Sequence, residues 1–131
     1  KQFPEHLVFF MLHHLHHPER TSLFHQIEER LSTTGQGIQP LFSELYKVRR
    51  QRLRIIIRMT ESYLLEIQSS MIMRDYLASI WSLTYGAAVI LNSSFYQRYL
   101  GSRDTLRVAY IDQALAMPKQ HQQFTSSLMT Q

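Results

Sequence analysis

The stretch PLFSELYKVRRQRLRIIIRMTESYLLEIQS, which runs from Pro40 to Ser69, predicts the fold class of this chain. It contains no Gly or Pro after its first residue, and it carries six of the fourteen Lys and Arg residues. An α-helix of this length, at a rise of about 1.5 Å per residue, is a rod of roughly 45 Å. Pro40 suits the first turn of such a helix, because the N–H that proline lacks has no intrahelical acceptor there. We therefore expect one long helix over about 40–69.

Helical periodicity divides this stretch into a polar side and an apolar side. The polar side collects Ser43, Glu44, Lys47, Arg50, Gln51, Arg54, Arg58, Glu61, Ser62, Gln68 and Ser69. The apolar side collects Leu41, Leu45, Val48, Leu53, Ile56, Met59, Tyr63, Leu64 and Ile67. A wide apolar face of this kind is typical of a helix that packs against other helices.

Two arginines interrupt the apolar face. Arg49 and Arg52 project from its middle, and an uncompensated charge in a protein core is costly. One interpretation is that both side chains reach the surface or pair with an acid from a neighbouring helix. The other is that this end of the helix extends beyond the core and both arginines contact another molecule.

The other segments also have helical patterns. Only four Gly and four Pro are present, which leaves little room for a turn-rich β fold. We expect further helices over about 3–17, 18–32, 71–91, 95–100 and 102–117, with a loop around Gly35 and Gly37. A break near Ser69 is needed, because a helix from Pro40 to Leu91 would be about 75 Å long and too long for a compact domain. The prediction is an all-α fold: a compact bundle of five to six helices with one long central amphipathic helix (about 40–69).

Length predicts a single domain. A chain of 131 residues can bury a core of its own. We expect one helical domain over 1–117 and a polar C-terminal tail over 118–131, since Pro118 stops the final helix. The first residue is Lys rather than Met, which suggests part of a larger chain or assembly.

No segment has the layout of a membrane span or a signal peptide. The apolar part of the longest uncharged run, 76–97, is about 16 residues, short of the roughly 20 that a membrane span needs. We therefore expect no membrane span and a buried helix in this region. The early apolar run is interrupted by His and Glu and lacks a small-residue cleavage site. Together with the absence of cysteine, this favours an intracellular protein.

The histidines are concentrated near the start of the chain. Six of the seven lie between His6 and His25. His13 and His17 stand one helical turn apart, a spacing that can hold a metal ion. However, the zinc-protease motif requires Glu directly after the first His, and His14 stands there instead. We expect a solvated or interface histidine face that could respond to pH, and no cofactor, with a metal site at His13 and His17 as the weaker alternative.

Excess positive charge is local to the long helix. From Glu44 to Glu61 there are six basic and two acidic residues, whereas the rest of the chain has eight of each. Lys47, Arg50, Arg54 and Arg58 form a stripe within an arc of about 80°. Such a stripe is a solvated face, a contact for an acidic protein, or a site for nucleic acid or anionic lipid. No nucleic-acid-binding module and no interleaved aromatic residues accompany it, which favours an acidic protein.

Motifs for catalysis are missing from the sequence. It has no cysteine and no G-x-S-x-G, and Gly35-Gln36-Gly37 lacks the Lys-Ser/Thr of a phosphate loop. We therefore expect a non-catalytic helical protein–protein interaction domain, an adaptor or scaffold, that binds a partner with an acidic surface. The alternatives are a nucleic-acid-binding domain that uses the basic stripe and, as the partner, a second copy of the chain. The expected partner-binding residues are Arg49, Arg52, Lys47, Arg50, Arg54, Arg58, Phe9 and Phe10, the last two because they flank the histidines on the first helix.

Overall fold

The computed structural model describes residues 2–34 and 39–120, and within them it contains six helices and no strand. The helices are α1 (Gln2–His16), α2 (Pro18–Thr34), α3 (Gln39–Glu66), α4 (Met73–Asn92), α5 (Ser94–Leu100) and α6 (Arg103–Ala116). The predicted all-α fold is confirmed, and so is the long helix. The predicted loop at Gly35 and Gly37, and residues 121–131 of the predicted tail, lie outside the described residues.

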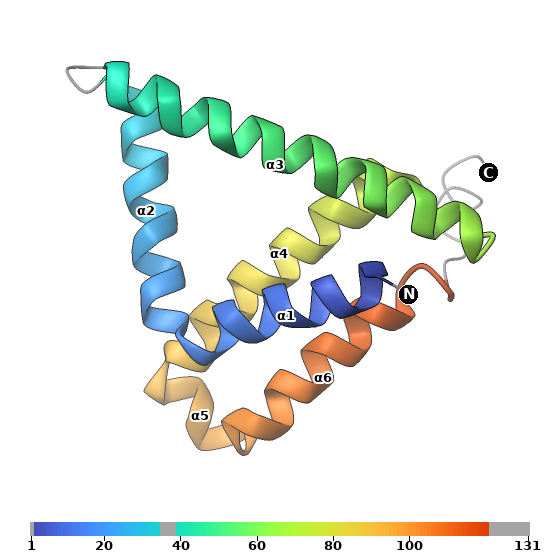
Figure 1. Cartoon of the computed structure of the whole chain (residues 1–131). Helices are drawn as coiled ribbons and strands as arrows, with labels where there is room; N and C mark the ends of the chain where they lie inside the picture. Colours follow the sequence, from blue (N-terminus) through green and yellow to red (C-terminus); the bar gives the residue numbers. More distant parts are fainter. Residues whose placement is uncertain (1, 35–38, 121–131) are drawn as a thin grey trace, which may run out of the picture.

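Helix α4 occupies the centre of the bundle and contacts each of the other five described helices. Its buried residues are Tyr76, Leu77, Ile80, Thr84, Ala87, Ala88 and Leu91. The long helix α3 differs from the prediction in its place, because it lies along one side and contacts α4 and α1 (Figure 1). A helix with six cations cannot be surrounded by apolar side chains, whereas α4 is uncharged after Asp75.

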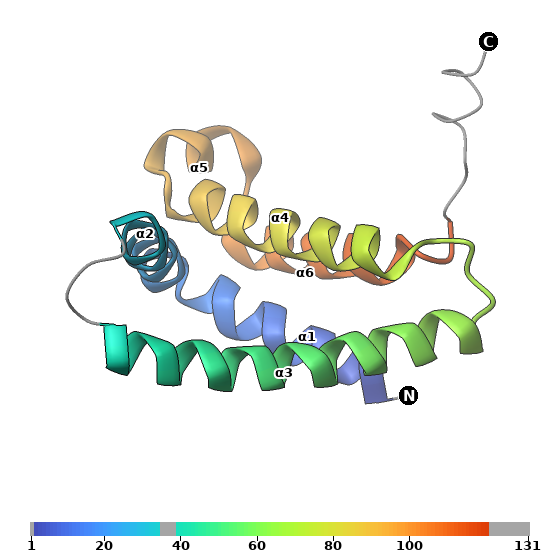
Figure 2. The same cartoon turned by 90° about the horizontal axis from the view of Figure 1, so that it is seen from above.

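The helices form two layers (Figure 2). Helices α1 and α3 lie on one side and α4 and α6 on the other, while α2 stands at one end. Helices α1 and α3 meet where the ring of Phe3 stacks on that of Tyr63, with 4.9 Å between the ring centroids. From there they diverge, and α2 connects α1 at the far end, so that α1, α2 and α3 outline a triangle (Figure 1).

The core lies where α1, α4, α6 and the C-terminal part of α3 meet. Its buried residues include Leu7, Met11 and Leu15 of α1 and Ile111 and Ala114 of α6. Burying apolar surface of this kind is the main source of stability in a domain of this size.

One hydrogen bond in the core compensates for a proline. The hydroxyl of Tyr76 donates to the carbonyl of Ala114 at 2.8 Å. In a helix that carbonyl would accept from the N–H four residues later, but Pro118 stands there and has none. Tyr76 therefore supplies the donor that α6 lacks, and burial raises the pKa of its phenol above the ordinary range.

The predicted break after the long helix is confirmed, although no glycine makes it. Gln68 has a positive φ of 56°. Around it the N–H of Ser69 donates to the carbonyl of Leu64 and the N–H of Gln68 to that of Leu65, which is a Schellman motif. The hydroxyl of Ser69 then donates to the carbonyl of Pro118 at 2.6 Å, which fastens this turn to the end of α6.

Candidate binding surface

The N-terminal part of α3 extends beyond the core. We call residues 44–58 the basic segment and residues 59–66 the core segment. In the basic segment Glu44 and every residue from Lys47 to Arg52 are exposed. In the core segment Thr60 is fully buried, and Tyr63 and Leu64 are buried too. Among the described side chains of α3, the buried ones therefore lie in the core segment, whereas most of those in the basic segment are exposed.

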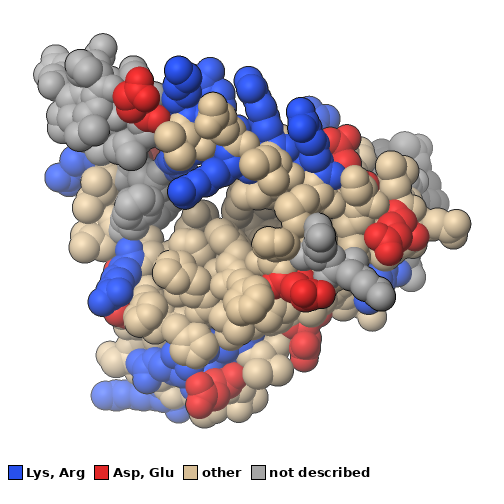
Figure 3. All heavy atoms as spheres, viewed as in Figure 1, with Lys and Arg blue, Asp and Glu red and all other residues tan. Residues whose placement is uncertain are grey.

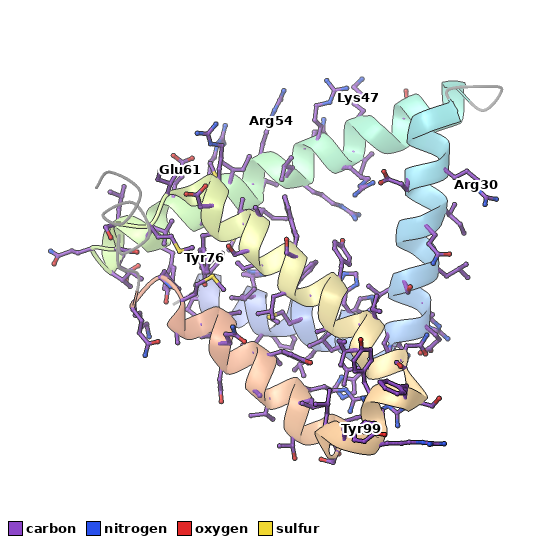
Figure 4. All side chains as sticks on the ribbon, turned by 180° about the vertical axis from the view of Figure 1, so that it is seen from behind. Arg30, Lys47, Arg54, Glu61, Tyr76 and Tyr99 are labelled. Atoms are coloured by element: carbon purple, nitrogen blue, oxygen red, sulfur yellow. The ribbon has the colours of Figure 1, made fainter. Side chains whose placement is uncertain are left out.

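All six basic residues predicted to contact a partner are exposed. Lys47, Arg50, Arg54 and Arg58 lie on the side of α3 that points away from the core, as the helical wheel predicted. Figure 3 shows Lys and Arg side chains gathered along α3. Lys47 and Arg54 project away from the bundle, whereas Arg30 projects from α2 in another direction (Figure 4).

Arg49 and Arg52 lie on the same side of α3 as Thr60 and Tyr63, which face the core in the C-terminal part of the helix. Counting from Arg49, the residues Arg52, Ile56, Thr60 and Tyr63 follow at three, seven, eleven and fourteen positions. These five residues share one face of the helix, which we call the seam. Its first three members are exposed and its last two are buried. Figure 3 shows the molecule hollowed within the triangle of α1, α2 and α3, where core would be needed to cover the first three.

Aliphatic side chains stand among the cations. Val48 is 44% exposed, Ile55 58% and Ile56 38%. Ile57 is the first residue along the described part of the basic segment that packs against the core. Exposed aliphatic groups alternating with arginine distinguish this segment from a purely solvated charged face.

Phe9 and Phe10 were predicted to belong to the same partner surface, and they occupy different environments. Phe9 is 72% exposed on the outer side of α1. Phe10 is partly buried against the core, and its ring lies 4.6 Å from that of His14. Phe10 therefore packs against the core, and of these two residues only Phe9 is an exposed apolar group.

His13 and His17 are both exposed, with ring centroids 6.4 Å apart. Among the described residues, no three His, Cys, Asp or Glu side chains are grouped so that they could hold a metal ion. The structure thus brings the two predicted ligands near each other but adds no third ligand from the part of the chain that it describes.

His14 fastens the corner between α1 and α2. The hydroxyl of Thr21 donates to the backbone carbonyl of His14 at 3.1 Å, and Nδ1 of His14 lies 3.0 Å from the same hydroxyl oxygen. Since the hydroxyl proton is already used, Nδ1–H must be the donor in the second bond. Burial, and secondly the neighbouring imidazole of His13, lower the pKa of His14 below its ordinary value.

Sequence reasoning missed an exposed aromatic group on α5. Phe95, Tyr96, Tyr99 and Leu100 are all exposed, and the Phe95 ring lies 5.4 Å from those of Tyr96 and Tyr99. None of the seven residues of α5 is buried, and Tyr99 marks its position in Figure 4. The short length was the available signal, because two turns between two caps cannot bury a full apolar face.

No protein family, curated protein or solved structure matches this chain. In the described part of the chain, no helix combines the length and the apolar character needed to cross a bilayer.

Proposed function

We propose that this chain is a non-catalytic protein-binding domain, an adaptor or scaffold element, whose docking surface is the basic segment of α3. The observation that supports this most directly is the uncovered part of the seam. Arg52 and Ile56 occupy positions that continue a core-packing face, but both are exposed. A helix face with this spacing is stabilised by a partner that covers it.

The charge of the segment specifies the chemistry of the partner. Six basic residues and the single acid Glu44 lie within residues 44–58. An acidic surface is complementary to this segment and is attracted to it at long range, whereas a basic surface is repelled. The partner surface is therefore acidic.

The aliphatic residues favour a protein over a nucleic acid. Val48, Ile55 and Ile56 gain from contact with apolar groups, which a phosphate backbone does not offer. Protein interfaces combine arginine with apolar side chains in this way. The row of Lys47, Arg50, Arg54 and Arg58 supports the second candidate, a nucleic-acid-binding domain, because such a row can follow a line of phosphates.

Contacts with the core hold α3 in place at the end next to the basic segment. The core segment is anchored by α1 and α4, and the Schellman motif with the Ser69 bond fastens its end. The basic segment therefore extends from a fixed base as a preformed helix. A preformed docking element has less conformational entropy to lose when it binds.

The test compares two double variants with equal change in charge. The test variant, Arg52→Glu with Arg54→Glu, reverses two charges in the basic segment. The control variant, Arg20→Glu with Arg74→Glu, reverses two charges elsewhere. Both control residues are exposed and lie near the starts of α2 and α4, where acidic side chains stabilise a helix. Labelled poly-glutamate and labelled duplex DNA serve as probes at low and high salt. A nuclease-treated native extract is the source of protein partners.

The expected result is that wild type and control bind poly-glutamate and retain the same acidic protein from the extract, and that the Arg52/Arg54 variant loses both while its helical circular dichroism is unchanged. Equal loss in both variants would show a dependence on net charge alone and would overturn the proposal. Tight, salt-dependent binding of duplex DNA, with no protein retained after nuclease treatment, would favour the second candidate.

A further inference from the structure

The seam of α3 keeps the same residue spacing along its whole length. Its spacing of three and four residues is the spacing at which one helix packs against another. In the core segment it does so: Phe3 of α1 stacks on Tyr63, and α3 contacts both α1 and α4. The uncovered part has the same spacing on the same continuous helix. The shape that fits it is therefore another helix.

The helices that cover the core segment do not continue over the basic segment. Helices α1 and α4 both diverge from α3 toward its N-terminal end (Figure 1), and Figure 2 shows α4 in the other layer. The exposed side chains from Lys47 to Arg52, and then Ile55 and Ile56, agree with this divergence. Residues 44–58 span about 22 Å, the length of about four helical turns.

A β-strand is a poorer occupant. Strand addition requires unpaired N–H and C=O groups at a sheet edge, and the backbone groups inside a helix bond to one another. The described part of the chain contains no strand to extend. Contact with the seam must therefore be made by side chains.

Charge argues against a second copy of the chain as the occupant. Two basic segments side by side would bring together twelve cations and two carboxylates, since each contributes six basic residues and Glu44. Like charges at this density repel each other, and burying them without acids is costly. An acidic helix has the opposite effect, because its carboxylates can pair with Arg52 on the seam and are attracted at longer range by the other cations of the basic segment.

We infer that the partner docks through an acidic amphipathic helix of about four turns, laid against the uncovered part of the seam. Its apolar residues contact Ile56 and the half-buried Leu53, and a carboxylate beside them meets Arg52. This inference rests on the proposed function and adds the form of the partner's docking element.

Two synthetic peptides of about 15 residues test the inference, with the whole chain as receptor. Both contain the same Leu, Glu and Ala residues and are capped at both ends. In the aligned peptide the leucines share one helical face. In the scrambled peptide they are spread around the helix. Binding is measured by fluorescence anisotropy, and helix formation in the peptide by circular dichroism.

The aligned peptide is expected to bind about tenfold more tightly than the scrambled one and to gain helicity on binding. Ile56→Ser should remove about tenfold of that affinity and leave poly-glutamate binding unchanged. Leu65→Ser is the matched control, because Leu65 is 79% exposed on the opposite side of α3 and its loss should leave both probes unaffected.

Three results would overturn the inference in distinguishable ways. Equal affinity for the two peptides, with poly-glutamate still bound, removes the helical partner but leaves an acidic one. An unchanged affinity of Ile56→Ser for the aligned peptide removes the seam as the contact. Absence of binding to poly-glutamate and to both peptides contradicts the proposed function as well.

Discussion

The basic segment and the core segment of α3 belong to one continuous helix, and they share one seam but not one environment. In the core segment the seam is covered by α1 and α4, and Thr60 and Tyr63 are buried. In the basic segment the same face carries Arg52 and Ile56, and both are exposed. Amphipathic spacing therefore identifies a helix face that can pack against another helix, and the tertiary arrangement determines how much of that face is buried within the chain.

This comparison separates two roles for similar residues. Aliphatic and hydroxyl side chains in the core segment stabilise the fold, because they lose contact with water when the chain folds. The exposed side chains in the basic segment contribute little to folding, because they remain in contact with water. They are therefore available to contribute to binding.

The largest expected effect is in the core segment. Leu64→Ala should lower the free energy of unfolding by about 3 kcal/mol, because the leucine is buried and the substitution leaves a cavity. Ile55→Ala in the basic segment should change it by less than about 0.5 kcal/mol. Urea denaturation followed by circular dichroism measures both. Similar losses in the two variants would mean that both segments are covered in solution.

The second prediction concerns the hydrogen bond between the Tyr76 hydroxyl and the Ala114 carbonyl, which lies in the core next to the core segment. Tyr76 packs against Phe3, which itself stacks on Tyr63. Tyr76→Phe should lower the free energy of unfolding by about 2 kcal/mol, because the buried carbonyl of Ala114 then has no donor in place of the N–H that Pro118 lacks. Thermal and chemical denaturation measure the loss.

Tyr99→Phe is the matched control for that substitution. Tyr99 is 70% exposed on α5, so removal of its hydroxyl should leave stability unchanged within about 0.5 kcal/mol. If Tyr76→Phe were as stable as this control, the Ala114 carbonyl would have to find another donor, and the account of the α6 terminus would be wrong.

Much of this arrangement could be predicted from the sequence, and the part that could not depends on long-range packing. Helical periodicity located the long helix, and Arg49 and Arg52 marked the place where the apolar face stops being covered. Periodicity could not show that α1 and α4 diverge from α3, because crossing geometry depends on contacts between distant segments. The exposed aromatic group of α5 was missed for a different reason, because the short length of that segment was a signal in the sequence itself.

The third prediction concerns the corner that positions α2, which precedes the basic segment in the chain. Because the pKa of His14 is lowered in the folded state, the unfolded chain takes up its proton first as pH falls through about 6.5. The free energy of unfolding should therefore decrease below that pH and level off below the lower, folded-state pKa. His14→Asn keeps an N–H donor for Thr21 and removes the titration.

Urea denaturation from about pH 7.5 to about pH 5 compares the two proteins. They should have similar stability at the upper pH, and the variant should lose less as pH falls. Equal slopes would mean that His14 is as accessible to protons in the folded protein as in the unfolded chain.

The smallest expected change in the free energy of unfolding is in the basic segment, and it is a gain, whereas the changes above are losses. Arg50, Arg54 and Arg58 follow one another at intervals of four residues, so Arg54 has a like charge one turn away on each side. Like charges at this spacing destabilise a helix by roughly 0.2–0.5 kcal/mol per pair. Arg54→Gln should therefore raise the free energy of unfolding slightly, and the gain should shrink at high salt because salt screens exposed charges.

Arg54→Lys keeps the charge and should show no gain, which separates repulsion from any effect of side-chain packing. A loss of stability on Arg54→Gln would instead show that the arginine makes a favourable contact in the folded chain. In that case the basic segment would contribute to folding as the core segment does. A small gain in stability together with a loss of poly-glutamate binding is the combination expected of a residue retained for a partner, because an acidic surface relieves repulsion among the cations.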